Sequence, residues 1–446
     1  MTGDCLVDDF APIDRFPTVD EMYAFATDLA DRHPNHVQLD DIGRSRAGDP
    51  IQLLTISQSS PPRGSILVVG QPHPNEPIGM ATIVALCERL AAQPETVERL
   101  GVAWHVVPCA DPDGTRLNEG WFAGPWARDF YARHFYRPGS EQQVEWTFPF
   151  STDDFSVDAP MPETVALMTA IDRVRPDVLV SLHNGELGGA YFYATPGYDA
   201  LYTELADLCE RTGVPLHLGD PETPLSTVLA PAVFSVPTAQ QIYEMAVAVG
   251  ADPAALVSGG SSLDYALRHR PTAGLVIELP YWRDPRAADE TPDPSGRSRR
   301  EVVLHGLALQ DESVARLHRL LDAAAPLPPS PFEDALRSFL AIDESGWIEG
   351  QRQQAQTSAE FERPATVAEV FSVMDNVHMS RLRLGGMLLR AVPTGSPAHA
   401  DAEAVFSTWV AEAAADNKAE PIPIRDLVAV QAGSILAAAQ HMLGAG

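Results

Sequence analysis

Two residues, His73 and Glu76, place an imidazole and a carboxylate three positions apart along the chain. They follow the apolar run 65–69, so a tight turn after a strand could aim both side chains at one ion. Zinc accepts nitrogen and oxygen ligands, and catalytic zinc sites commonly have three protein ligands and one position for water. An isolated H-x-x-E pair is frequent by chance, and a surface turn is its commoner explanation.

His183 and Glu278 each stand directly after a further apolar run. Ligands of open α/β sheets bind beyond the carboxyl ends of the strands, so we expect both side chains near His73 and Glu76. We predict that His183 is the third metal ligand, although a buried neutral histidine would be equally ordinary there. Glu278 is predicted to be the general base, in apolar surroundings that disfavour its ionised form. The alternative for Glu278 is a strand-end carboxylate in a salt bridge.

The elements that must position these side chains alternate apolar runs with helical patterns. This layout predicts an α/β fold with a mixed, mostly parallel twisted sheet flanked by helices. An opening hairpin is expected at 37–39 and 51–56, and the central strands at 65–69, 102–107, 178–182 and 275–277. Helices are expected at 18–32, 80–90, 161–174, 201–211, 332–340, 367–387, 402–415 and 424–443.

Two segments break this alternation. Residues 121–150 are rich in aromatic side chains, which predicts an insert that packs over the site. The proline-rich stretch 325–331 predicts a linker. We therefore expect a catalytic domain at 1–325 and a mainly helical C-terminal extension at 326–446.

The composition excludes some classes of partner. The net charge of −30 leaves no basic surface for nucleic acid and disfavours anionic membranes. The four cysteines form no C-x-x-C pair, which fits a reducing compartment. No apolar run is long enough to span a membrane, and the acidic N-terminus has no apolar signal segment. We expect a cytoplasmic protein, whose oligomeric state the sequence leaves open.

The ordered motifs resemble those of the zinc carboxypeptidase family related to carboxypeptidase A, over residues 16–320. They are the segment 41–51, His73 with Glu76, the turn 111–114, the segments 162–164 and 181–183, and 259–265 ahead of 277–279. The resemblance implies one Zn²⁺ per chain, held by His73, Glu76 and His183, with Glu278 as base. It also implies that Arg116 stabilises the oxyanion beside the metal; a structural ion pair is the alternative.

The chain departs from the family in two places. The Asn-Arg pair that binds a substrate's terminal carboxylate is missing, and 144–148 stand in its place. The family's mobile tyrosine is also missing, because 254–257 contain none. Specificity is therefore expected to differ from that of ordinary C-terminal exopeptidases. Arg128, Arg133 or Arg137 could replace the pair, although a solvated surface role is more common.

Several further residues are candidates for substrate binding. Asn118, Asn184 and Glu186 lie close in sequence to the proposed site and are as well suited to local turn hydrogen bonds. Trp121 and Trp146 belong to the aromatic insert. The predicted function is zinc-dependent hydrolysis of an amide bond in a peptide or peptide-like small molecule. The alternatives are a zinc-dependent deacylase of acylated amino acids or small amides, and a catalytically inactive binding protein.

Overall fold

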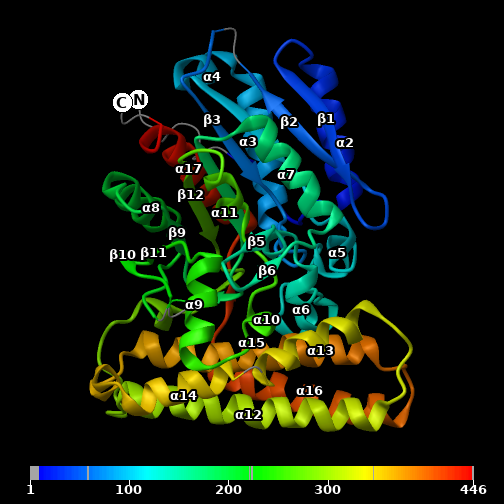
Figure 1. Cartoon of the computed structure of the whole chain (residues 1–446), viewed down its shortest axis with the longest axis vertical. Helices are drawn as coiled ribbons and strands as arrows, with labels where there is room; N and C mark the ends of the chain where they lie inside the picture. The colour runs from blue at the N-terminus through cyan, green and yellow to red at the C-terminus, as the bar shows by residue number, and fades with distance from the viewer. Residues whose placement is uncertain (1–9, 58–59, 220, 222–224, 345, 444–446) are drawn as a thin grey trace.

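A nine-stranded mixed sheet forms the centre of the protein, as the computed structural model shows (Figure 1). The structure describes residues 10–57, 60–219, 221, 225–344 and 346–443; Cys5 and most of the N-terminal segment lie outside this range. Across the sheet the strands are β1 (Val37–Arg44), β2 (Pro50–Ile56), β4 (Val102–Val107), β3 (Gly64–Val69), β7 (Val178–His183), β12 (Ala273–Glu278), β9 (Tyr191–Ala194), β11 (Val233–Ser235) and β10 (Val228–Ala230).

The four central strands β4, β3, β7 and β12 run parallel, so their carboxyl ends meet at one edge. The flanking pairs β1–β2, β2–β4, β12–β9 and β10–β11 are antiparallel. Strand β7 is buried along its whole length, which accounts for its mostly apolar sequence before His183. The predicted mixed α/β fold is confirmed, with the parallel strands at the centre.

Helices cover both faces of the sheet. One face packs against helices α2 (Val19–Arg32), α3 (Ile78–Ala92), α8 (Asp199–Thr212) and α17 (Ile424–His441). The other face packs against helices α7 (Pro162–Val174) and α11 (Ser262–Leu267). Local sequence sets where they begin: α2 starts after Thr18, whose hydroxyl accepts a hydrogen bond from the Glu21 N–H while the Glu21 carboxylate accepts one from the Thr18 N–H.

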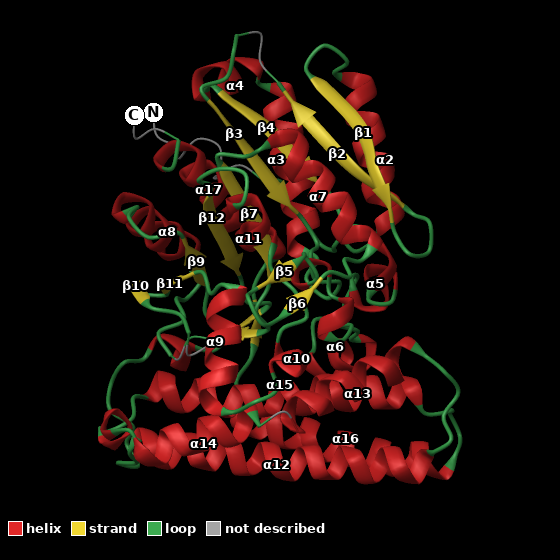
Figure 2. Ribbon diagram, viewed as in Figure 1, coloured by secondary structure: helices red, strands yellow, loops and turns green. Residues whose placement is uncertain are grey.

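A layer of long helices lies beyond the carboxyl ends of the parallel strands (Figure 2). The layer consists of α12 (Arg299–Ala324), α13 (Pro331–Glu344), α14 (Trp347–Thr357), α15 (Val367–Ala391) and α16 (Pro397–Asp416). Helix α15 packs against α12, α13 and α16, and also against the short helix α6 (Arg128–His134). The helical layer therefore touches the part of the protein where the strand ends place their side chains.

The packing differs from the predicted division at residue 325 in two places. Helix α12 precedes that point but belongs to the helical layer, while α17 follows it and packs on the sheet between α3 and α8. Helix α17 is buried around nearly its whole circumference, as its apolar sequence requires. The small strand β14 (Glu420–Pro421) also pairs with β13 (Trp282–Arg283). The C-terminal residues therefore complete the sheet domain instead of following it.

The aromatic segment 121–150 contributes mostly to the core. Trp121 and Tyr131 are buried and meet edge to face, with ring centroids 4.8 Å apart. Trp121 also packs against Phe16 and Tyr281, at 5.5 and 5.2 Å. The segment is thus held by aromatic contacts within the core. Of its tryptophans, Trp146 is the one that lines the cavity described in the next section.

The remaining elements are short connections. They are α4 (Pro94–Leu100), α5 (Pro112–Arg116), α9 (Ala239–Val249), α10 (Pro253–Leu256), β5 (Phe150–Ser151), β6 (Ser156–Val157), β8 (Leu187–Gly188), and the 3₁₀ turns η1 (Glu119–Trp121), η2 (Ser140–Gln142), η3 (Val144–Trp146), η4 (Pro285–Ala288) and η5 (Ala359–Glu362). Among the described residues, no helix combines the length and apolar character needed to cross a membrane.

Candidate metal centre and substrate cavity

The turn between β3 and α3 carries His73 and Glu76. Gln71 adopts a left-handed conformation with φ of 54°, and its side-chain amide donates to the Pro74 carbonyl at 2.9 Å. The Glu76 N–H donates to the His73 carbonyl at 3.1 Å. Because all of these residues are buried, the turn presents the imidazole and the carboxylate in fixed positions.

His183 and Glu278 come from neighbouring strand ends. They are the last residues of the parallel strands β7 and β12, and the register pairs them directly. The His183 Nδ1 atom lies 3.7 Å from Glu278 Oε1, and both side chains are buried. The parallel register thus brings together two residues that are 95 positions apart in the chain.

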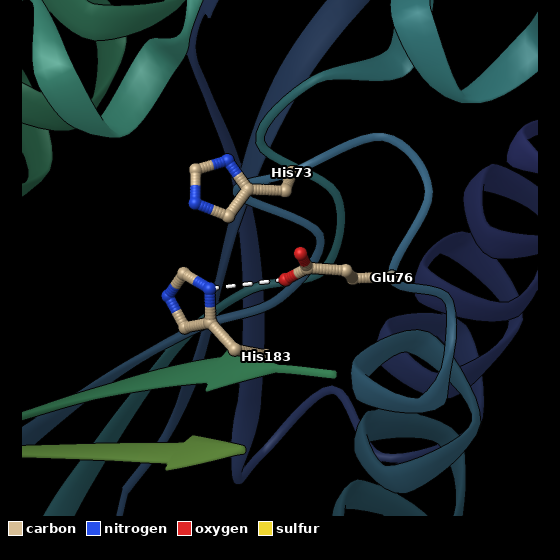
Figure 3. A group of neighbouring side chains, drawn as sticks. All are labelled: His73, Glu76 and His183. Carbon is tan, nitrogen blue, oxygen red and sulfur yellow. Dashed lines mark hydrogen bonds and ion pairs between the residues drawn. The ribbon is translucent and has the colours of Figure 1, made fainter. Parts of the chain in front are cut away.

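His73, Glu76 and His183 form the metal cluster (Figure 3). One potential ligand atom from each residue lies within 4.8 Å of the other two. His183 Nδ1 is 3.0 Å from Glu76 Oε2, while His183 Nε2 is held by the Ser181 hydroxyl at 2.8 Å. His73 Nδ1 is buried without a hydrogen-bond partner among the described residues. This donor set fits a zinc ion, because two imidazoles and a carboxylate converge and one nitrogen lacks any other partner.

The electrostatic surroundings keep His73 and Glu76 in the forms that bind a metal. Burial, assisted by the charges of Arg137, His183 and Arg383, lowers the pKa of His73 well below its ordinary value, so the imidazole is neutral. Burial alone would raise the pKa of Glu76. The Arg137 guanidinium, 2.8 Å from Glu76 Oε1, and His183 outweigh burial and lower that pKa, so Glu76 is ionised.

A cavity of about 420 Å³ adjoins the metal cluster. Glu278 lines it together with Trp146, whose ring centroid lies 6.5 Å from that of His73. Further parts of the wall come from the segments 236–242 and 255–264, from strands β7, β9 and β12, and from the helices α13, α14 and α15. Two arginines, Arg137 and Arg383, are among its described lining residues.

Asn184 follows His183 and also lines the cavity. Its backbone N–H donates to Glu76 Oε2 at 3.2 Å, and its side-chain oxygen accepts from the Ile78 N–H and the Tyr281 hydroxyl, both at 3.1 Å. The side chain is therefore engaged in holding the turn before α3. Asn184 thus helps to orient the metal ligands, while its contact with substrate stays a prediction.

Glu186 belongs to a second buried group, which we call the arginine cluster: Arg128, Glu186, Asp375 and Arg383. Glu186 accepts from Arg128 Nη2 at 2.7 Å and from Arg383 Nε at 3.0 Å. Arg128 Nη1 also reaches Asp375 at 3.1 Å. Glu186 therefore lines the cavity, where two guanidinium groups neutralise it.

Residues 22–283 match the family model for zinc carboxypeptidases. The chain belongs to the zinc carboxypeptidase family. The family is zinc-dependent and acts on peptide substrates. Its matched segment contains the whole metal cluster and Glu278, and ends before the helical layer that begins with α12.

Comparison with individual proteins gives lower similarity. Over 151 residues the chain is 27% identical to Zinc carboxypeptidase A 1 of Anopheles gambiae, a match that covers 32% of this chain and 34% of the mosquito protein. Bovine thrombin-activatable fibrinolysis inhibitor, solved with a tick carboxypeptidase inhibitor, matches 61% of this chain and 87% of its own at 11% identity and a TM-score of 0.40. Carboxypeptidase A of Helicoverpa armigera matches 61% and 66% at 17% identity, with the same TM-score.

Arg116 does not have the place that the family resemblance implied. It is absent from the described residues that line the cavity, and its guanidinium binds Asp49 at 2.8 Å and Asp20 at 2.7 Å. These two carboxylates are the physical reason, because they hold Arg116 at the surface beside α2. The structural ion pair is thus the role that the structure gives Arg116.

Two other predicted contacts also lie outside the described lining of the cavity. Asn118 is buried and links helix α5 to the aromatic segment 121–150. Its side-chain amide donates to the carbonyls of Gly114 and Tyr136 at 3.2 and 2.8 Å. Trp121 is 1% exposed, within the aromatic core. Both are structural because the chain after α5 turns into the interior.

Sequence reasoning found Arg137 only as one of three possible carboxylate binders and did not find Arg383. Arg137 carried no local signal, since it lies within the irregular aromatic segment 121–150. Arg383 had a weak signal, because it stands in an amphipathic helix at four-residue spacing from Phe371, Asp375 and Met379. A charged residue on the same helix face as apolar residues such as Phe371 and Met379 indicates a buried charge.

Proposed function

We propose that this chain is a zinc-dependent hydrolase that cleaves an amide bond in a peptide or peptide-like small molecule. The observation that carries the proposal is the convergence of His73, Glu76 and His183 on one point, beside Glu278 and a cavity. The family supports the hydrolytic chemistry. The role of Glu278 and the choice of substrate are our own assignments.

His73, Glu76 and His183 would hold one Zn²⁺ per chain. When bound, zinc would act as a Lewis acid and lower the pKa of a water molecule. Glu278 lies next to His183, so its carboxylate is placed to accept a proton from the attacking water and to deliver it to the leaving nitrogen. Asn184 and Ser181 keep the ligands in place while this happens.

Arg137 takes the role that the family resemblance implied for Arg116. Its Nη1 atom binds Glu76 and its Nε atom binds Gln143 at 3.1 Å, which fixes the guanidinium beside the metal cluster. A guanidinium held in advance next to the reacting carbonyl stabilises the negative charge that develops there. We expect Arg137→Met to reduce turnover on every substrate.

The specificity is proposed to differ from that of C-terminal exopeptidases. In the segment 144–148, which stands where the family has its Asn-Arg pair, the side chains that line the cavity are Glu145 and Trp146. Glu145 is buried and accepts from the Ser262 N–H at 3.1 Å. Burial raises the pKa of Glu145, and the residue supplies no positive charge to hold a substrate's terminal carboxylate, as the Asn-Arg pair of the family does.

The test is product analysis on zinc-loaded protein with a library of free peptides, C-terminally amidated peptides and N-acylated amino acids. We expect about one zinc per chain and cleavage that does not depend on a free C-terminus. Release of single C-terminal residues from ordinary peptides would contradict the altered specificity. Absence of stoichiometric zinc, combined with normal binding of a partner, would favour the inactive binding protein.

A deacylase of acylated amino acids or small amides is the second candidate. It is favoured by the helices α13, α14 and α15, which wall the cavity and leave a volume of about 420 Å³ suited to a small ligand. Faster turnover of N-acyl amino acids than of any tetrapeptide in the same library would select it. Location in the cytoplasm stays a prediction from the sequence.

A further inference from the structure

Helix α15 contributes one stripe of side chains to the cavity. Phe371, Asp375, Met379 and Arg383 recur at intervals of four residues and all line it. This spacing places them on a single face of the helix. Helix α15 lies beyond residues 22–283, the segment that matches the family, so this wall is an addition to the family's site.

Arg383 is the cation of this stripe, and it is rigidly held. Its guanidinium lies over the Phe135 ring, 5.1 Å from the centroid, and its Nε atom donates to Glu186 at 3.0 Å. One turn further on, Gly386 lets α15 approach the backbone of α6, since a Cβ at Gly386 would lie 1.8 Å from the Ala132 carbonyl oxygen. The close packing of the two helices thus fixes where Arg383 points.

Within the described chain, Arg383 makes its side-chain hydrogen bond through Nε, to Glu186. Its two terminal nitrogens have no hydrogen bonds there. A guanidinium offers five N–H donors in a planar fork, so Nη1 and Nη2 remain available on the cavity side. Arg137, the other arginine of the cavity, uses both Nη1 and Nε for protein partners. Arg383 is therefore the better equipped of the two to bind a ligand.

The charge balance around Arg383 favours an anion. Glu186 is shared between Arg128 and Arg383, so one carboxylate faces two guanidinium groups. The second acid of the cluster, Asp375, is fully buried, and burial raises its pKa, which favours its neutral form.

We propose that Arg383 binds a carboxylate of the substrate through Nη1 and Nη2, so that the helical layer supplies the anion recognition beside the metal cluster. A carboxylate matches the planar guanidinium fork with two parallel hydrogen bonds. The substrate class that follows is an amide carrying an acidic group, such as an acidic side chain or a dicarboxylic acyl group. This assignment deepens the proposed hydrolase function and rests on the same cavity.

The experiment compares two probes on the zinc-loaded full-length protein by calorimetry: N-benzylsuccinamate and its neutral carboxamide analogue, N-benzylsuccinamide. They differ only in the replacement of the carboxylate by an amide. We expect the wild-type protein to bind the carboxylate more tightly by about ten-fold or more. In Arg383→Met the affinity for the carboxylate probe should fall to about the affinity for the neutral analogue. Arg383→Lys should retain part of the preference.

Two further variants separate binding from folding. Arg381→Met on the same helix is the matched control, because Arg381 binds Ser313 and Glu412 and is not among the described residues of the cavity wall. It should keep the full preference. The double variant Arg383→Met with Glu186→Gln also removes the carboxylate that loses one of its two arginine partners, and should fold while still lacking the preference.

The outcomes are decisive in both directions. An equal preference for the carboxylate in the wild-type protein and in Arg383→Met would overturn the assignment, because the anion would then be bound elsewhere, for example at the metal. A wild-type protein without any preference would overturn it as well. Binding needs no turnover, so a preference that depends on Arg383 in a protein inactive on all amides would support this assignment and contradict the hydrolase.

Discussion

Two buried clusters of charged side chains meet at the same cavity and differ in how their charges are balanced. In the metal cluster, acceptor atoms of His73, Glu76 and His183 face one another, and one nitrogen has no partner among the described residues. In the arginine cluster, Arg128 and Arg383 bind Glu186 at 2.7 and 3.0 Å. Burial is similar in the two clusters, but only the first requires an added cation.

The difference shows how buried polar groups indicate function. Burial of a charged group is costly unless a partner compensates it, so a cluster that is complete within the chain is structural at least in part. A cluster whose ligand atoms converge, with one imidazole nitrogen left without a partner among the described residues, is built for a ligand that supplies positive charge. By this criterion the metal cluster is a binding site, and the arginine cluster is a support that leaves the two terminal nitrogens of Arg383 unused.

The strongest test of the comparison removes one ligand from the metal cluster. His183→Ala leaves one imidazole and one carboxylate, so we expect zinc to fall from about one to below about 0.1 per chain and turnover to be lost. Elemental analysis and the amide assay measure both. His269→Ala, which removes a partly exposed histidine paired with Asp172 outside the cavity wall, should keep zinc and activity. Full zinc content in His183→Ala would refute the ligand assignment.

The next test separates the base from the ligands. Glu278→Gln keeps the shape of the side chain but cannot accept the proton, so turnover should fall by about 10²–10⁴-fold. Zinc content should stay near one per chain, because Glu278 is not among the three ligand residues. Loss of zinc equal to that in His183→Ala would contradict this division of roles.

Much of the metal cluster could be predicted from the sequence, because its positions follow from local rules. His183 and Glu278 each end an apolar run, and parallel strands bring such ends to one edge. His73 and Glu76 lie close enough for one turn to aim both. The prediction of the general fold was confirmed for the same reason, since strand and helix periodicity are local properties.

The rest of the cavity depends on contacts between distant segments, which periodicity does not specify. Arg383 reaches the site because α15 packs on α6 through Gly386, about 250 residues further along the chain than Ala132. Arg116 follows the family turn but is bound by two aspartates, Asp20 and Asp49, from other elements. Trp121 is buried for the same kind of reason, since its partners Phe16 and Tyr281 lie far away in sequence.

Breaking the arginine cluster should affect stability instead of metal binding. Arg128→Gln leaves Glu186 and Asp375 with too few donors in a buried place, so we expect a loss of about 3–5 kcal/mol in the free energy of unfolding. Denaturant unfolding measures this loss, and zinc content should not change. Arg173→Gln removes an exposed pair with Asp40 and should cost less than about 1 kcal/mol. Equal losses in the two variants would show that the arginine cluster stabilises the fold no more than a surface ion pair does.

Asp111 offers the smallest and most specific test, since it is a buried carboxyl with neither a metal nor an arginine as partner. One oxygen accepts from the Gly114 N–H at 2.9 Å, the other has no partner among the described residues, and burial raises the pKa to about 7. The folded state therefore favours the protonated form. Its contribution to stability is full below the ordinary value of 3.8 and is lost as pH rises through about 7.

Asp111→Asn stays neutral and keeps an oxygen for Gly114, so its stability should not follow this part of the pH dependence. We expect the melting temperature of the variant, relative to the wild-type protein, to rise by about 2 °C between about pH 5 and about pH 8. A difference that is constant over this range would mean that Asp111 is ionised in the folded state. Burial without a cation would then not be enough to keep a carboxyl protonated in this protein, and the contrast between the two clusters would weaken.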